Sequence, residues 1–309
     1  MRSLLPGEPV SVAEADRIMV RKPPDLHSIL RVLAEPRPPL PVGESWFVGC
    51  QNQGNAYGTL FGGQLLGQAV LAASETVPDR LIHSVHAYFL APGVIDRPVR
   101  YQVENGREGR SFAHRRVTAS QDTAIFSMNC SFRSAEIGWQ HQTPMPDVPP
   151  PEDLEEITAI VARRDPGLLD QWISHFAGNN PIDLRPVRSD LALERQSTTR
   201  RQTWVRIPLL SGTDDQAIHR AGLAWLSDYW VSSAGLVLHR HPLPGPDVLL
   251  ASIDHALWIH RPVRVDDWLL FDADSPVAQD GTALVRGQIY DRSGALIANV
   301  AQELLQRLR

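Results

Sequence analysis

Cysteine and lysine are both scarce in this chain of 309 residues. It contains two cysteines, Cys50 and Cys130, and one lysine, Lys22, among 30 basic residues. Two cysteines cannot build a disulfide framework, and no Cys-x-x-Cys sequence is present to bind zinc. We therefore expect both thiols to pack as small hydrophobic groups, and we attribute the scarcity of lysine to genome composition rather than to function.

Long apolar runs and a strong net charge are also absent. No stretch reaches the roughly 18 consecutive apolar residues that a membrane-spanning helix needs, and the first residues lack the apolar run of a signal peptide. The net charge of −5 gives no electrostatic reason to expect a nucleic-acid partner. With 43% hydrophobic and 21% charged residues, the composition is that of a globular protein. We expect a soluble, cytoplasmic protein without a membrane span.

Common catalytic and metal-binding motifs are missing or incomplete. No Gly-x-Ser-x-Gly sequence is present, which argues against an α/β-hydrolase with a serine nucleophile. Gly58-x-x-x-x-Gly63 resembles a phosphate loop until Gln64 replaces its lysine, so these glycines are expected to serve a turn and close packing. Four histidines lie in strand-like segments without neighbouring metal ligands and are expected to be core or supporting residues: His83, His86, His255 and His260. We expect no metal and no other cofactor.

One long apolar helix followed by alternating strands occurs twice in the sequence. The first helix is expected over 62–76 and the second over about 217–238. Strands follow the first helix at 81–90, 98–105, 111–120 and 124–133, and the second at 249–259, 267–274, 282–290 and 295–305. A helix that is apolar on nearly all sides must be buried on nearly all sides, and a curled sheet is its simplest cover. We expect an α+β fold of two tandem units, each with a long central helix wrapped by an antiparallel sheet.

Shorter elements and proline-rich stretches divide the rest of the chain. We expect a loose N-terminal extension over 1–25, a first domain over 26–140, a connector over 141–180 and a second domain over 181–309. Short helices are predicted over 26–34 and 152–164, and short strands over 46–49 and 203–207. Sheet edges that remain exposed favour association, so we expect a homo-oligomer.

A polar residue lies on an otherwise apolar face of the last strand. Because side chains alternate along a strand, one face of 295–305 is formed by Leu296, Ala298, Val300, Gln302 and Leu304. A buried amide costs roughly 1–3 kcal/mol unless it is hydrogen-bonded. The same pattern in the first half is formed by Phe126, Met128, Cys130 and Phe132, with Cys130 at the position of Gln302. Only the second half therefore places polar chemistry inside.

Asp228 and Ser252 also interrupt apolar segments of the second half. Asp228 lies on the helix expected to be buried, where an ionised carboxylate needs hydrogen-bond donors or a shifted pKa. Ser252 lies near the start of the following strand. From the residues alone, each also has a structural interpretation, as a satisfied carboxylate and as an ordinary strand hydroxyl.

Several stretches of the chain carry a more specific signal, in a fixed order. They are FGGQLLGQA (61–69), HSVHAYFLAPG (83–93), DLRPV (183–187), RQTW (201–204), SD (227–228) and IDHALWIHRP (253–262). Over about residues 40–309 they resemble the acyl-CoA thioesterase II family. The resemblance implies a double hot dog fold and an enzyme of fatty acid metabolism that hydrolyses fatty acyl-CoA to free fatty acid and CoA. It also implies that Asp228, Ser252 and Gln302 form the hydrolytic site.

These residue types suit thioester hydrolysis by a water molecule. The reaction needs a water near the carbonyl carbon, a base for its proton, and donors for the developing oxyanion. We expect Asp228 to be the base, and Ser252 and Gln302 to orient the water without an acyl-enzyme. In the first half, Gln68 lies roughly where Asp228 does and Cys130 where Gln302 does. Neither can serve as a carboxylate base, so one active site per chain is expected.

Two other functions stay open at this point. One is a non-catalytic acyl-CoA binding protein, and the other is a hot dog enoyl-CoA hydratase or dehydratase, whose chemistry usually pairs an Asp with a His. The sequence does not identify the substrate-binding residues. Arg110, Arg115 and Arg116 are candidates for contacts with CoA phosphates, although arginines on strands are usually solvated.

Overall fold

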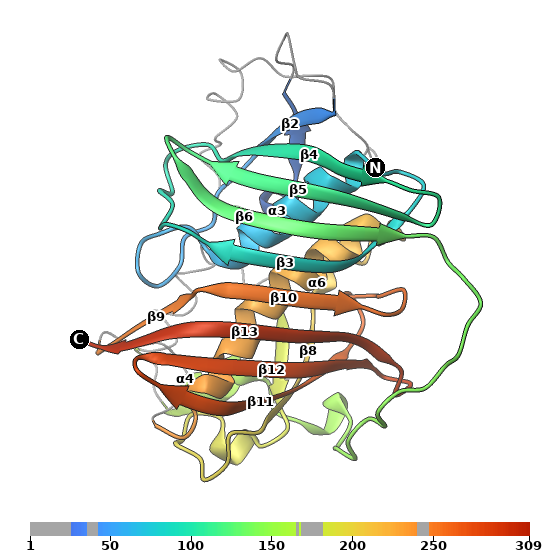
Figure 1. Ribbon diagram of the computed structural model, residues 1–309. Coiled ribbons are helices and arrows are strands. Elements are labelled where there is room, and N and C mark those ends of the chain that lie inside the picture. Colours follow the sequence, from blue (N-terminus) through green and yellow to red (C-terminus); the bar gives the residue numbers. More distant parts are fainter. Residues whose placement is uncertain (1–25, 36–42, 165–166, 168–181, 240–246) are drawn as a thin grey trace. The chain divides into compact units, whose positions relative to one another are not determined.

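The computed structural model describes residues 26–35, 43–164, 167, 182–239 and 247–309 (Figure 1). These residues fall into two compact units, the first within Met1–Ile137 and Thr213–Trp225 and the second within Gly138–Gly212 and Leu226–Arg309. The expected extension over 1–25 and much of the end of the expected connector lie outside the described residues. The domain boundaries predicted from the sequence stay predictions.

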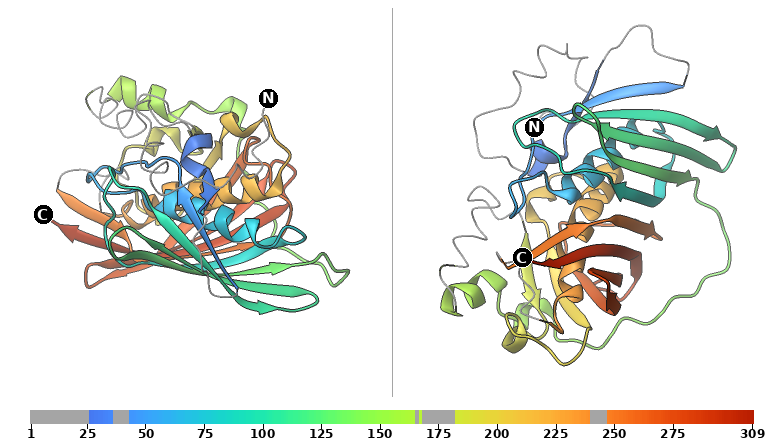
Figure 2. Two further views of the ribbon diagram at one scale, coloured as in Figure 1. Left: turned by 90° about the horizontal axis from the view of Figure 1, so that it is seen from above. Right: turned by 60° about the vertical axis from the view of Figure 1, so that its left-hand side comes forward.

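The first unit contains a central helix against an antiparallel sheet. Its elements are α2 (Leu26–Leu30), β1 (Val32–Ala34), β2 (Glu44–Gly49), α3 (Gly62–Glu75), β3 (Leu81–Phe89), β4 (Arg100–Glu108), β5 (Phe112–Ser120) and β6 (Ala124–Arg133). The strands follow the order β1-β2-β4-β5-β6-β3, and α3 packs on one face of them (Figures 1 and 2). This arrangement confirms the helix and the four long strands predicted for this half of the chain.

The short helix predicted over 26–34 is wrong in its second half. The helix ends at Leu30, and Val32–Ala34 form β1, which pairs with β2 through Val32 and Gly49. A helix of nine residues is marginal by itself. The extended conformation of β1 instead satisfies backbone groups along the edge of β2.

Glycines allow a close helix contact within the first unit. Its Thr213–Trp225 stretch contains most of α6 (Gln216–Trp230). A Cβ atom at Gly63 would lie 2.6 Å from the backbone oxygen of Trp225, and one at Gly67 would lie 3.1 Å from that of Ala221. Any side chain at these positions would push the helices apart, which confirms the packing role expected for the glycine at the start of α3.

The second unit contains its own antiparallel sheet. Its elements are α4 (Ile157–Arg164), β7 (Asp183–Pro186), β8 (Arg201–Arg206), the end of α6, β9 (Val248–Ser252), β10 (Asp254–Ile259), β11 (Leu269–Gln279), β12 (Thr282–Asp291) and β13 (Leu296–Leu308), with short 3₁₀ turns at Pro151–Asp153, Ser189–Leu191, Pro208–Leu210 and Val231–Gly235. The strand order is β10-β13-β12-β11-β8-β7, and β9 pairs with the C-terminal part of β13 (Figure 1).

Three expectations for the second unit need correction. The helix predicted over 152–164 begins only at Ile157, after a 3₁₀ turn over Pro151–Asp153. The strand predicted over 249–259 is interrupted at Ile253, and the long helix ends at Trp230 before a 3₁₀ turn over Val231–Gly235. The hydroxyl of Ser233 donates to the backbone oxygen of Trp230 across 2.7 Å, so the side chain satisfies a carbonyl group released at the helix end. Among the described helices, none combines the length and apolar character required to cross a membrane.

Candidate active site

The end of α6 fixes the position of Asp228. The indole Nε1 of Trp230 donates to the hydroxyl of Thr203 on β8 across 2.8 Å, which ties this end of the helix to the sheet. Trp230 is only 4% exposed, so the contact is also shielded from water. Asp228 precedes it by half a turn and is 5% exposed. The helix therefore holds a carboxylate inside the second unit, as the sequence pattern predicted.

A β-bulge brings two polar side chains to one face of the β9–β10 segment. Ser252 lies opposite Leu304, but Ala256 lies opposite Ala301, so the β9–β10 side has one residue more than β13 at this point. The backbone N–H of Glu303 donates to Oδ1 of Asp254 across 2.7 Å, which satisfies a group that the irregular ladder would leave unpaired.

The bulge changes which side chains of the β9–β10 segment point inward. Opposite residues of an antiparallel pair share a face, and Leu304 is buried, so Ser252 points inward beside it. Leu257 lies opposite Val300 and is buried, so His255, two residues earlier, points inward as well. In a regular strand, Ser252 and His255 would point to opposite faces.

Gln302 occupies the inner face of β13 between these two residues. Its side chain is fully buried, as are those of Ala298, Val300 and Leu304 on the same face, which confirms the predicted pattern for these residues. The prediction is wrong for Leu296, because a register shift against β12 places it opposite Tyr290, with which it packs in a separate cluster. Its Nε2 donates to Oδ1 of Asp228 across 2.7 Å and also to the hydroxyl of Ser252. The amide that the sequence singled out is therefore hydrogen-bonded.

The structure brings the three predicted site residues together. The hydroxyl of Ser252 donates to Oδ1 of Asp228 across 2.8 Å, so each of the three side chains contacts the other two. Among the described residues, Oδ1 accepts both hydrogen bonds and Oδ2 accepts none, so Oδ2 is the oxygen that can take a proton from a water molecule. The arrangement combines a base, Asp228, with two groups, Ser252 and Gln302, that can orient the water molecule.

Two further residues belong to this cluster and were not predicted as part of it. Nδ1 of His255 lies 3.2 Å from Oε1 of Gln302, and Nε2 of His255 lies 2.9 Å from the hydroxyl of Ser227. Burial lowers the pKa of His255, and this effect outweighs the opposing influence of Asp228 and the hydrogen bond with Gln302. If side chains alternated regularly from Ser252, His255 would point to the outer face, so the strand pattern offered no reason to include it. The signal for the bulge was Asp254, because aspartate is a poor strand former.

Of the other singled-out histidines, His83 is half-buried, whereas His86 and His260 are exposed, so a core role is wrong for these two. Nε2 of His83 lies 2.9 Å from the hydroxyl of Ser131, and Nε2 of His260 lies 2.8 Å from Oδ1 of Asn299. Within the described part of the chain, no group of three or more His, Cys, Asp or Glu side chains is placed to hold a metal ion.

In the first unit, Gln68 lies at the helix position that corresponds to Asp228, and its side-chain amide is fully hydrogen-bonded. Oε1 of Gln68 accepts from the hydroxyl of Tyr101 across 2.5 Å and from Nε2 of Gln64 across 3.3 Å. Its Nε2 donates to the backbone oxygens of Ile29 and Gln51. Four hydrogen bonds use the full capacity of this amide, so Gln68 has a structural role.

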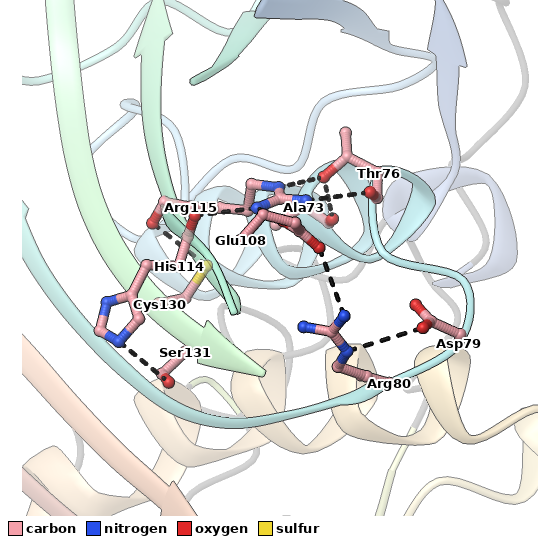
Figure 3. Close-up of polar contacts among 9 residues, drawn as sticks. All are labelled: Ala73, Thr76, Asp79, Arg80, Glu108, His114, Arg115, Cys130 and Ser131. Carbon is pink, nitrogen blue, oxygen red and sulfur yellow. Dashed lines mark hydrogen bonds and ion pairs between the residues drawn. The ribbon is translucent and has the colours of Figure 1, made fainter. Parts of the chain in front are cut away.

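The surroundings of Cys130 are also structural (Figure 3). The thiol lies 3.5 Å from the backbone oxygen of Arg115, and burial raises the pKa of Cys130 to about 12. The guanidinium of Arg115 donates to the hydroxyl and backbone oxygen of Thr76 at the end of α3, and it forms an ion pair with Glu108. Arg115 is thus neither solvated nor available for CoA phosphates, because it caps the helix instead.

Comparisons with known proteins agree with this architecture. A family model described as the acyl-CoA thioesterase C-terminal domain matches residues 146–306, and one described as the N-terminal domain matches residues 52–133. Acyl-coenzyme A thioesterase 8 from Homo sapiens is 36% identical over 260 residues, which cover 81% of this chain and 81% of the human protein.

Solved structures show the same fold. The crystal structure of acyl-CoA thioesterase II TesB2 from Mycobacterium marinum aligns with this chain with a TM-score of 0.73 and 33% sequence identity. The alignment covers 92% of this chain and 99% of the TesB2 chain. A protein with a hot dog fold from Alicyclobacillus acidocaldarius is 22% identical, with a TM-score of 0.67 and coverage of 85% and 94%. The double hot dog fold expected from the sequence is confirmed. The matches over both halves show that this chain belongs to the acyl-CoA thioesterase II family.

Proposed function

We propose that the protein hydrolyses fatty acyl-CoA to free fatty acid and CoA at Asp228, Ser252 and Gln302. The observation that carries the proposal is the convergence of these side chains, from a helix and two separate strands, on one buried point of the second unit. The human relative is named an acyl-coenzyme A thioesterase, which supports the substrate class.

In the proposed reaction, water attacks the thioester directly. Oδ2 of Asp228 accepts a proton from the water as its oxygen bonds to the carbonyl carbon. The hydroxyl of Ser252 and the amide of Gln302 hold the carboxylate in place and orient the water. The tetrahedral intermediate then collapses, the carbon–sulfur bond breaks, and CoA leaves as the thiol after taking up the proton.

The contacts of His255 argue against the hydratase alternative. A hydratase of this kind needs an Asp and a His that both reach the substrate. Here the two ring nitrogens of His255 contact Ser227 and Gln302, so the ring supports the cluster from behind. The first unit has neither a carboxylate at Gln68 nor an amide at Cys130, so one active site per chain is part of the proposal.

Release of free thiol from acyl-CoA tests the proposed function. We expect purified protein to release CoA thiol from a series of acyl-CoA chain lengths, and Asp228→Asn to remove this activity. A wild-type protein that binds acyl-CoA without thiol release would support the binding-protein alternative. Loss of enoyl-CoA absorbance without thiol release would support the hydratase.

The cytoplasmic location and homo-oligomeric state expected from the sequence remain proposals. Cell fractionation followed by immunodetection tests the first. Sedimentation equilibrium of the purified protein tests the second, and a mass of one chain at micromolar concentration would contradict it.

A further inference from the structure

A continuous line of hydrogen bonds extends behind the proposed catalytic residues. It starts at the hydroxyl of Ser227, passes through both ring nitrogens of His255, and reaches Oε1 of Gln302. The amide group of Gln302 then links the line to Asp228 and Ser252. Ser227, His255 and Gln302 are each at most 1% exposed, so water does not substitute for these contacts.

The donor and acceptor of each hydrogen bond can be assigned in turn, starting from the carboxylate of Asp228 and ending at Ser227. An ionised Asp228 only accepts, so the nitrogen of the Gln302 amide must face it. The amide oxygen then faces His255, and Nδ1 must carry the proton that it donates. Burial lowers the pKa of His255 and keeps the ring neutral, so Nε2 is an acceptor and the hydroxyl of Ser227 is its donor.

The amide of Gln302 has two orientations that fill the same space. In the reverse orientation its oxygen would face Oδ1 of Asp228, and two acceptors would meet in a buried site. The donor on Nδ1 of His255 favours the productive orientation because only an oxygen can accept from it. The hydroxyl of Ser227 favours the same orientation indirectly. By donating to Nε2 of His255, the hydroxyl stabilises the ring tautomer that carries the proton on Nδ1.

We propose that His255, held by Ser227, is a positioning residue that fixes the orientation of the Gln302 amide for hydrolysis, an inference that rests on the proposed function. The β-bulge at Ile253–Asp254 is part of this device, because it lets Ser252 and His255 contact Gln302 from the same face. Asp254 on the bulge and Asp228 on α6 are the charged groups that act on the His255 ring.

Matched substitutions at His255 test the proposal. His255→Asn retains a nitrogen donor near the position of Nδ1, whereas His255→Leu fills the space without one. We expect His255→Leu to lower kcat about 10²-fold with little change in KM, because it misorients a group needed only for the chemical step. We expect His255→Asn to remain within about tenfold of the wild type. Ser227→Ala should cause a smaller loss of kcat than His255→Leu.

A double-mutant cycle separates positioning from a general effect on the fold. If His255 acts through Gln302, His255→Leu should have no further effect on kcat in a Gln302→Ala background. Equal losses in both backgrounds would overturn the proposal. Circular dichroism and melting temperature identify any variant that fails to fold.

Nuclear magnetic resonance of the wild-type protein gives a test that needs no substitution to remain folded. The ¹⁵N shifts of His255, assigned by comparison with His255→Asn, should show a neutral ring with a protonated Nδ1 at pH 7. An unprotonated Nδ1 would overturn the proposal.

The proposed function can fail separately. If the wild type released no thiol, the hydrolase itself would be wrong. If the wild type and His255→Leu had equal kcat while Asp228→Asn was inactive, only the positioning role would be wrong.

Discussion

The amide nitrogen of Gln302 lies 2.7 Å from Oδ1 of Asp228. The two residues come from the last strand and from the long helix and are separated by 74 positions in the sequence. Both are at least 95% buried. The contact explains how the chain tolerates a carboxylate and an amide in its interior, since each satisfies part of the hydrogen-bonding capacity of the other.

Asp228→Asn should nearly abolish thioester hydrolysis while retaining the fold. The asparagine oxygen can still accept from Ser252 and Gln302, but the base is lost, so kcat should fall by about 10³-fold or more. Because a buried charge is removed, the melting temperature should stay the same or rise. Thiol release and thermal denaturation measure the two effects. Full activity of this variant would contradict the proposed base.

Gln302→Ala should lower kcat by about 10²–10³-fold, because it removes a donor that orients the reacting groups. The matched control is Cys130→Ala, at the equivalent strand position of the first unit. It should change the melting temperature slightly and leave kcat near the wild-type value. If the two substitutions had equal effects on kcat, the assignment of the active site to the second unit would be wrong.

Treatment with a chelator should leave the rate of hydrolysis unchanged. Asp228 supplies the base, and the proposed water attack does not need a Lewis acid. The measurement is thiol release after dialysis against ethylenediaminetetraacetic acid, with and without added divalent metals. Loss of activity that one specific metal restores would refute the metal-free mechanism.

His255 should make the stability of the protein sensitive to mild acid. Burial lowers the pKa of His255 below its ordinary value of 6.5, so between 6.5 and the lower folded-state pKa the unfolded chain binds a proton that the folded chain does not. The free energy of unfolding should therefore fall as the pH drops below 6.5 and be fully retained above it.

Denaturant unfolding of the wild type and of His255→Asn from pH 8 to pH 5 checks this expectation. The difference between the two should be constant above pH 7 and should shrink toward pH 5 as the wild type loses its advantage. A constant difference over the whole range would show that His255 does not titrate with a lowered pKa.

The sequence by itself determined the architecture and the identity of the central polar residues. Two apolar helices, each followed by alternating strands, predicted two sheets that bury them, because a helix that is apolar on nearly all sides must be buried and a curled sheet is its simplest cover. Gln302 could be found because strand alternation has a fixed period, so one amide on an apolar face is visible without a structure. Asp228 could be found because a carboxylate is conspicuous on a helix that is otherwise apolar on nearly all sides.

Only the tertiary structure decided how these residues meet and what supports them. The bulge between Ser252 and His255 depends on the register of β9 and β10 against β13, and register is a long-range property that local alternation cannot give. The strand β1 likewise formed because the edge of β2 was available for pairing. The supporting role of His255 became visible for this reason, since one extra residue in a strand reverses the face of every side chain that follows it.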